Sequence, residues 1–259
     1  MIGSIIGDIA GSTYEFIGNK DYNVLLFPRG ADYTDDSILT VATAHSILTG
    51  LDYRRSYQLF GQKYPDPMGG YGMRFAGWLE AGADAVPYNS WGNGAAMRAG
   101  PIGWAYASLE ETLAIAEKSA SVSHNHPEGI KGAQATAMAT WMARNGKSKD
   151  EIRQAISQQF GYDLSRSAAE IRKNYSFNES CQGTVPEALV AFLDSTDFED
   201  AIRLAISLGG DADTVGCITG GIAEAFYREI SQDMKSIAER LMPSEFVQIV
   251  HQFTEKYSS

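Results

Sequence analysis

"FEDAIRLAISLGGDADTVG", residues 198–216, joins a helical pattern to a short acidic segment that lies between glycines. Apolar residues recur at three- and four-residue steps up to Gly209, and glycine is typical of a helix end. Asp211, Asp213 and Thr214 follow, and a second apolar helical pattern begins directly after them. Because helical patterns lie on both sides of the acidic segment, the stretch favours a helical fold with carboxylates at a helix N-terminus.

The same helical periodicity dominates the rest of the chain. Alternating strand patterns are nearly absent, and "VLLF" at 24–27 is the best strand candidate. Segments rich in Gly, Pro and Asn fall between helices, without a charge run or low-complexity tract that would mark a linker. Four segments fit a capping box, in which a hydroxyl and a carboxylate satisfy each other's backbone N–H groups: Ser108–Glu111, Ser148–Glu151, Thr184–Glu187 and Thr196–Glu199. We therefore predict an all-α fold in a single compact domain that spans residues 1–259.

The composition argues against several functional classes. The chain carries 21 Lys and Arg against 32 Asp and Glu, and this net charge of −11 disfavours binding to nucleic acid or anionic membranes. No segment reaches the ~18 apolar residues of a membrane span, and the N-terminus lacks the basic region of a signal peptide. Cys181 and Cys217 show no disulfide-framework spacing. We expect a cytoplasmic, monomeric protein.

A second acidic cluster lies at the start of another predicted helix, in "YTDDSILTVATAHSIL", residues 33–48. Thr34, Asp35 and Asp36 precede its apolar pattern. Helix capping explains one acidic residue at each helix start, because a cap needs one acceptor. Tandem aspartates, together with Glu15, would repel one another strongly unless a cation lay between them. Oxygen ligands of this kind suit Mg²⁺, Mn²⁺ or Ca²⁺ rather than zinc.

Two other interpretations of the acidic segments fail on their context. An EF-hand needs ligands spread through one loop that ends in a glutamate, which neither cluster supplies. The letters "DADTV" also fit the nucleophile loop of haloacid-dehalogenase-type phosphatases. That loop must follow a buried strand, whereas a helical pattern precedes Asp211. Capping and cation binding are the two interpretations that remain.

Taken together, the motifs resemble those of the ADP-ribosylglycohydrolase family, in the family's order and over nearly the whole chain. "IIGDIAGSTYEF" resembles its N-terminal motif, "YTDDS" its T-D-D motif and "GGDADTVG" its G-G-D-x-D-T motif. Between them, "SWGNGAAMRAGPIG" and "SHNHPEGIKGAQA" resemble the family's substrate loops. The resemblance implies an all-α orthogonal multi-helix domain. It also implies a centre of two divalent cations, Mg²⁺ or Mn²⁺, that hydrolyses the bond between ADP-ribose and its acceptor.

The resemblance further implies roles for individual residues. The metal ligands carried over are Thr34, Asp35, Asp36, Asp211, Asp213 and Thr214, with Glu15 completing the site. Our hypothesis for catalysis is that Asp213 bridges the metals and that Glu15 or Asp36 assists proton transfer, an alternative that the sequence leaves open. The substrate-binding positions carried over are Ser90, Trp91, Gly92, Asn93, Gly94 and His124.

For several residues around these motifs, a structural role is either an alternative to a functional one or the role that we expect. Trp91 either covers the ribose or base of the substrate or lies in the core, and Arg98 either neutralises phosphate or forms a structural ion pair. We expect His126 to hydrogen-bond within its loop and His45 to be a satisfied core histidine. For Asp8 we expect a hydrogen-bonded structural carboxylate rather than a metal ligand.

The leading functional hypothesis is hydrolysis of ADP-ribosyl groups from a protein or another ADP-ribose conjugate. We expect nucleic acid to bind only where it is itself an ADP-ribosylated substrate. One alternative is a non-catalytic, crystallin-like member of the family that binds ADP-ribose, and the other is a metal-dependent nucleotide phosphoesterase. The intact acidic clusters argue against the non-catalytic alternative, because a site without a function has no reason to retain like charges. The sequence leaves the acceptor open among arginine, serine, a base and a small metabolite.

Overall fold

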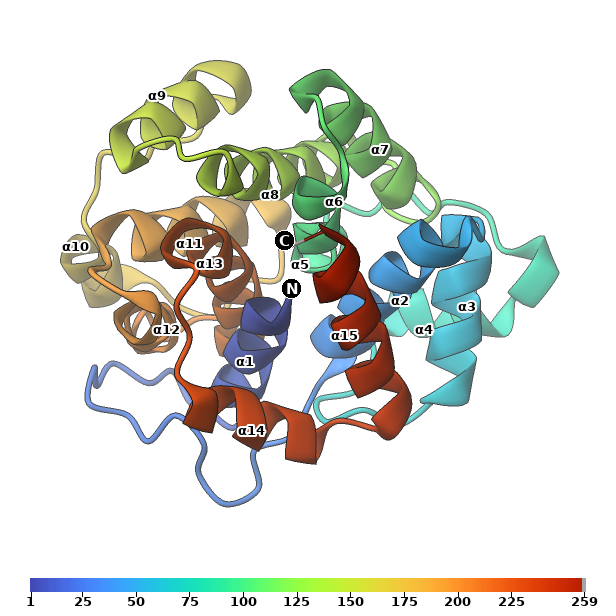
Figure 1. Ribbon diagram of the computed structural model, residues 1–259, viewed down its shortest axis with the longest axis horizontal. Helices are drawn as coiled ribbons and strands as arrows, with labels where there is room; N and C mark the ends of the chain where they lie inside the picture. The colour runs from blue at the N-terminus through green and yellow to red at the C-terminus, as the bar shows by residue number, and fades with distance from the viewer. Residues whose placement is uncertain (258–259) are drawn as a thin grey trace.

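The computed structural model describes residues 1–257, and helices make up almost all of its regular structure (Figure 1). Extended pairing within this range is limited to two isolated bridges, Thr34 with Met68 and Gly92 with Ser180. The all-α prediction is therefore confirmed. The helices run in the order α1 (Ile2–Gly11), α2 (Asp35–Thr49), α3 (Tyr53–Lys63), α4 (Met73–Glu80), the short 3-10 helix η1 (Gly82–Asp84), α5 (Gly94–Met97), α6 (Gly100–Ala105), α7 (Leu109–Ser121), α8 (Pro127–Arg144), α9 (Lys149–Phe160), α10 (Ala168–Asn174), α11 (Cys181–Asp194), α12 (Phe198–Ser207), α13 (Ala212–Tyr227), α14 (Gln232–Leu241) and α15 (Ser244–Tyr257).

Some predicted helix starts differ from the observed ones. Ser148 and Glu151 form the expected capping box at the start of α9. The predicted start at Thr184 is wrong, because Ser180 caps α11 through the backbone N–H of Gly183 and the helix begins four residues earlier. The predicted cap at Thr196 is also wrong, because Asp197, one residue later, caps α12 with its side chain.

The strand candidate at residues 24–27 is also wrong. Val24 and Leu26 are buried while Leu25 is exposed, so the alternation seen in the sequence is real. Its backbone carbonyls, however, accept hydrogen bonds from the side chains of Arg203 and Tyr14. Because side chains rather than a neighbouring strand satisfy this backbone, the segment remains part of the long loop between α1 and α2.

Helix α1 lies in the middle of the molecule, and its most extensive contact is with α13 (Figure 1). The contact is made through glycines. A Cβ added at Gly7 would lie 2.0 Å from the carbonyl oxygen of Gly216, and one added at Gly216 would lie 2.4 Å from that of Gly7. Gly3 and Gly220 meet in the same way one turn away. The two backbones therefore touch, which explains why glycine is present here despite its cost within a helix.

Both ends of the described chain contribute to the same apolar core. The larger core cluster contains residues from Met1 to Phe253, and the isoleucines at 5, 6 and 9 of α1 are fully buried in it. A smaller cluster, rich in alanine, joins α5 and α6 to α7 and α8. A core shared in this way is what a single domain requires.

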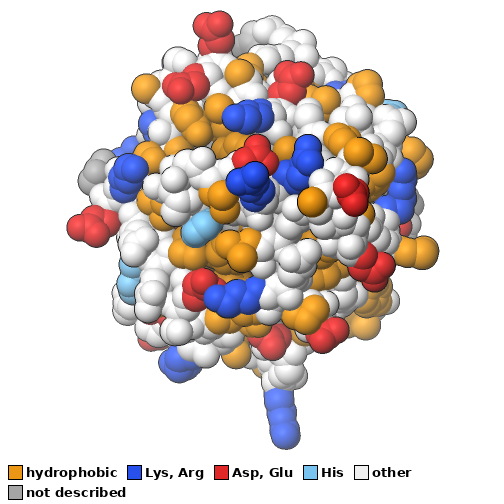
Figure 2. All heavy atoms as spheres, turned by 90° about the vertical axis from the view of Figure 1, so that its right-hand side faces the viewer, with side chains coloured by type: hydrophobic (Ala, Val, Ile, Leu, Met, Phe, Trp, Pro, Cys, Tyr) orange, Lys and Arg blue, Asp and Glu red, His pale blue; other side chains and the backbone are white. Residues whose placement is uncertain are grey.

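The surface and the helix lengths bear on possible partners. Figure 2 shows the side that carries α3, where Lys and Arg side chains are interspersed with Asp and Glu rather than gathered in one patch. Within residues 1–257, no helix combines the length and the apolar character that crossing a membrane requires.

Replacing Gly216 by alanine tests the contact between α1 and α13. The added methyl group must push the two backbones apart, so we expect Gly216→Ala to lower the free energy of unfolding by about 3 kcal/mol. Gly77→Ala is the matched control, because Gly77 lies in α4 with nothing within 4 Å of an added Cβ. There alanine should raise stability by about 0.5–1 kcal/mol. Urea denaturation measures both, and equal stabilities for the two variants would contradict the contact.

Candidate metal centre

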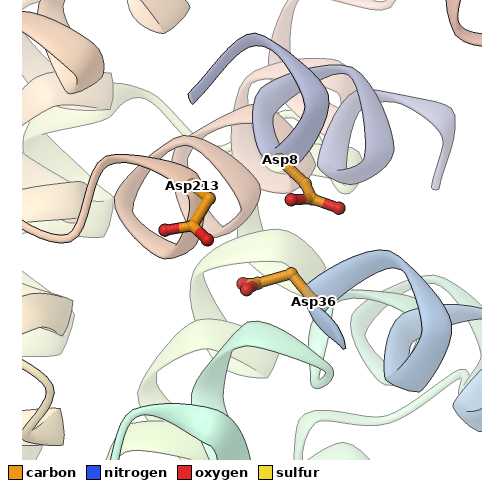
Figure 3. Close-up of side chains that lie close together, drawn as sticks. All are labelled: Asp8, Asp36 and Asp213. Carbon is orange, nitrogen blue, oxygen red and sulfur yellow. The ribbon is translucent and has the colours of Figure 1, made fainter. Parts of the chain in front are cut away.

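Carboxylates from three helices meet beside the contact between α1 and α13. Asp8 lies on α1, Asp36 in the first turn of α2 and Asp213 in the first turn of α13, and Figure 3 shows their side chains pointing toward one another. One oxygen from each lies within 4.8 Å of the others. Side chains more than 200 positions apart in the sequence therefore form one cluster.

A second cluster shares a member with the first. Oxygens of Glu15, Asp211 and Asp213 also lie within 4.8 Å of one another. Asp213 belongs to both clusters, so it lies between two groups of carboxylates. Such an arrangement fits two neighbouring cations that share one ligand.

Asp8 has the structural role that its sequence context predicts. Its carboxylate accepts hydrogen bonds from the backbone N–H of Thr34 (3.0 Å) and Ser37 (3.1 Å), and from both their hydroxyls. These bonds tie α1 to the start of α2. The sequence analysis nevertheless missed that Asp8 also lies in the first cluster. The available signal was an ionisable residue on an otherwise apolar helix, where burial requires partners.

The two predicted threonine ligands both contact Asp36. The hydroxyls of Thr34 and Thr214 are each 3.2 Å from Oδ2 of Asp36. Thr34 also caps α2, because its hydroxyl accepts from the backbone N–H of Asp36. Asp35 lines the adjacent cavity but belongs to neither cluster.

Burial and mutual repulsion disfavour the charged form of these carboxylates. Burial, followed by the neighbouring acids, raises the pKa of Asp35, Asp36 and Asp213 well above its ordinary value. The pKa of Asp211 is raised by burial, and that of Glu15 is raised to about 8 by burial and then by Asp211. An ionised cluster of this kind is costly unless positive charge compensates it.

The same residues fit a divalent cation by their chemistry. Among the described residues, Oδ1 of Asp36 and Oε2 of Glu15 are buried without a hydrogen-bond partner. A buried oxygen without a donor is normally costly, and a metal ion can take the donor's place. All the atoms offered are hard oxygens, the ligands of Mg²⁺, Mn²⁺ or Ca²⁺. The ligand set therefore fits the ions that the sequence predicts.

A cavity of about 720 Å³ opens beside the carboxylates, and the predicted substrate loop lines it. Ser90, Trp91, Gly92, Asn93, Gly94 and His124 all contribute to its wall. The amide of Asn93 donates to Asp211 (2.6 Å) and to the hydroxyl of Thr184 (3.1 Å), which fixes the loop against the acidic cluster. The structure thus brings the two predicted sites into one cavity.

Exposure and contacts show which of the expected roles Trp91, His126 and His45 have. Trp91 is 47% exposed at the cavity wall and packs against His126, so it is not a core residue. His126 accepts a hydrogen bond from the N–H of Glu128 at the start of α8, which is the loop role expected for it. His45 packs against Phe60 outside the cavity.

The chain is similar to known proteins both in its sequence and in its structure. The family model described as ADP-ribosylglycohydrolase matches residues 1–258 of the chain. The chain is 25% identical to ADP-ribosylhydrolase ARH3 of Homo sapiens, over 88% of this chain and 84% of that protein. It is 26% identical to ADP-ribosylarginine hydrolase Tri1 of Pseudomonas putida, over 88% of this chain and 69% of that protein. A solved structure, an ADP-ribosylglycohydrolase-related protein complex, shares the fold with a TM-score of 0.62 at 24% identity, covering 92% of this chain and 96% of its own.

The pH dependence of stability tests the coupling between the carboxylates and a cation. A carboxyl whose pKa is higher in the folded than in the unfolded state binds its proton more tightly when folded. Stability should therefore fall as pH rises from about 4, the ordinary carboxyl value, to about 8, the raised pKa of Glu15. We expect the Tm of chelator-treated protein to fall from pH 5 to pH 8. Mn²⁺ or Mg²⁺ should raise Tm more at pH 8, where fewer protons compete.

The contribution of Glu15 to this slope can be measured separately. Glu15→Gln should flatten the fall of Tm with pH, because it removes one of the titrating groups. Glu80→Gln is the control, since Glu80 is exposed at the end of α4 and should leave the slope unchanged. A Tm that rises from pH 5 to pH 8 in the chelator-treated wild type would contradict this assignment.

Proposed function

Because the chain belongs to the ADP-ribosylglycohydrolase family, we propose that it hydrolyses the glycosidic bond between ADP-ribose and an acceptor, using two divalent cations. The observation that carries the proposal is the position of Asp213 in both carboxylate clusters, on the wall of a cavity large enough for a nucleotide-sized ligand. Breaking the bond at the ribose anomeric carbon passes through an oxocarbenium-like state and needs an activated water.

We assign the ligands of the two cations as follows. Asp213 is shared, and Asp36 lies with it in the first cluster while Glu15 and Asp211 lie with it in the second. Thr34, Asp35 and Thr214 complete the set carried over from the family motifs. Two such ions, when bound, supply positive charge that fixes the ribose hydroxyls and lowers the pKa of a bound water.

The structure also favours one of the two candidates for proton transfer. Asp36 is 1% exposed, and its Oδ2 already faces two threonine hydroxyls. Glu15 is only partly buried and lines the cavity. A group that exchanges protons with a water must reach the open part of the cavity. We therefore assign proton transfer to Glu15, in addition to its place in the second cluster, and ligand binding alone to Asp36.

We assign binding of the ADP-ribose group to the substrate loop, residues 90–94, and to His124, which line the same cavity. The loop of residues 90–94 lies beside the acidic cluster and is fixed to it through Asn93. Trp91, half-exposed at the wall, offers a flat apolar surface for the ribose or the base. Because its relative Tri1 is an ADP-ribosylarginine hydrolase, ADP-ribosylarginine is the first substrate to test. Serine-linked ADP-ribose, another acceptor that the sequence leaves open, is the second.

Replacing Asp213 by asparagine tests the proposed function. The change keeps the size of the side chain but removes the charge that both clusters share, so we expect release of ADP-ribose to fall by about 10³-fold or more. Asp84→Asn is the matched control, because Asp84 is exposed in η1, outside the cavity. Release of ADP-ribose from modified peptides is followed with Mg²⁺ or Mn²⁺, with and without chelator.

Each alternative function predicts a different product in this assay. Binding of ADP-ribose without release would favour a non-catalytic member of the family. Release of AMP or inorganic phosphate would favour a phosphoesterase. Full activity of Asp213→Asn would contradict the shared-ligand assignment.

A further inference from the structure

Arg98 lines the candidate cavity but, within the described part of the chain, lacks the ion pair that is one of its two expected roles. It is fully buried, and its guanidinium lies over the ring of Tyr57 at 4.1 Å from the centroid. No carboxylate among the described residues forms a salt bridge with it. Its hydrogen bonds within residues 1–257 run from Nη2 to the carbonyl of Ser119 (3.4 Å) and to the hydroxyl of Ser123 (2.8 Å). A buried guanidinium without an anion is costly, so its position needs a reason.

The hydroxyl of Ser123 connects Arg98 to His124. Ser123 Oγ lies 2.8 Å from Nδ1 of His124, and both residues are buried. A guanidinium only donates hydrogen bonds, so the serine oxygen must accept from Arg98. The hydroxyl proton then needs an acceptor, and within the described chain Nδ1 is the one in reach of Ser123 Oγ. Both groups are satisfied when Nδ1 carries no proton and the proton of a neutral imidazole lies on Nε2.

The Nε2 atom of His124 faces the predicted substrate loop. A Cβ added at Gly94 would lie 3.2 Å from Nε2, and one added at Gly92 would lie 3.5 Å from it. His124 also lines the cavity. Nε2 therefore lies beside Gly92 and Gly94 of this loop, at the cavity wall.

The surroundings of His124 keep its ring neutral. Burial, followed by the charges of Arg98 and Arg74, holds the pKa of His124 well below its ordinary value. The rings of Tyr88 and Phe75 pack against it at centroid distances of 5.4 and 6.4 Å. Neither ring supplies an anion that would stabilise an imidazolium.

We propose that Arg98 and Ser123 are positioning residues that hold His124 as the Nε2–H tautomer, a fixed hydrogen-bond donor to an oxygen of ADP-ribose. The identity of this ligand rests on the proposed function, whereas the tautomer does not. Because Nδ1 is already an acceptor for Ser123, His124 cannot take a proton there, and it acts as a donor rather than as a general base. The buried guanidinium of Arg98 then has a role that requires no contact with the substrate.

The tautomer can be measured directly by two-bond ¹H–¹⁵N NMR on the protein of residues 1–259 with ¹⁵N-labelled histidine. The signals of His124 are assigned by their loss in His124→Gln. We expect the wild type to show Nε2 protonated and Nδ1 unprotonated throughout pH 6–8. In Ser123→Ala the Nδ1 atom loses its donor, so a mixture of the two tautomers should appear. A wild type with Nδ1–H or an imidazolium, or a Ser123→Ala spectrum unchanged from wild type, would overturn the proposal.

Ser119→Ala is the matched control for this experiment. Ser119 is as buried as Ser123, but its hydroxyl contacts Tyr57 at 2.6 Å rather than His124. This variant should keep the Nε2–H tautomer, which separates loss of the hydrogen bond from loss of any buried serine. A tautomer change in Ser119→Ala as large as that in Ser123→Ala would contradict the specific role of Ser123.

Calorimetric titration with ADP-ribose then tests the role of the donor. We expect Ser123→Ala to bind about fivefold to tenfold more weakly than wild type, the effect of one misdirected hydrogen bond. Ser119→Ala should bind within about twofold of wild type. Equal affinity of Ser123→Ala and wild type would overturn the donor role. If the wild type binds no ADP-ribose, the proposed function fails, and the NMR result alone still decides the tautomer.

Discussion

The direct contact between the backbones of α1 and α13 is the constraint on which the rest of the molecule depends. Gly7 and Gly216 leave no room for a Cβ on either side. Asp8 follows Gly7 by one residue and Asp213 precedes Gly216 by three, so the contact sets the distance between the two carboxylates. The start of α2 is then fixed to α1 by the hydrogen bonds of Asp8, which brings Asp36 into the same cluster.

Placing several carboxylates at two helix N-termini offsets only part of their repulsion. A helix dipole contributes about 0.3–1 kcal/mol per charge near its N-terminus, whereas burying an unpaired charge costs several kcal/mol. Capping does not explain the second cluster, because Asp211 is the N-cap residue of α13 and its side chain caps no N–H group. At α2, by contrast, Thr34 is a true cap. The excess of carboxylates over capping groups is a repulsion that a bound cation would offset.

The sequence predicts local features better than contacts between distant segments. Helical periodicity and the box at Ser148 are local patterns, and they correspond to helices in the structure. The predicted start of α11 at Thr184 is wrong because the capping pattern does not include the bonds of Ser180, whose hydroxyl donates to Asn178 and accepts from the N–H of Gly183. The strand candidate at 24–27 fails because the partners of its backbone lie elsewhere in the chain.

The same limit applies to the candidate site. The acidic motifs could be found because each is a short run of letters, and their family order linked them before any geometry was known. The participation of Asp8 in the first cluster depends on the crossing of two helices. The hydrogen bond from Arg98 to Ser123 joins residues 25 positions apart. Neither of these two features produces a residue spacing in the sequence that periodicity or a capping rule would detect.

The glycine contact also determines when the centre can form during synthesis. Gly7 and Gly216 are separated by about 200 residues of chain. At roughly 5–20 residues per second, a ribosome needs about 10–40 s to make the segment between them. During that interval the buried isoleucines of α1 have no α13 to pack against. Helix α1 thus lacks its most extensive contact throughout this interval, and the carboxylates of Asp8 and Asp213 meet only after residue 216 has been made.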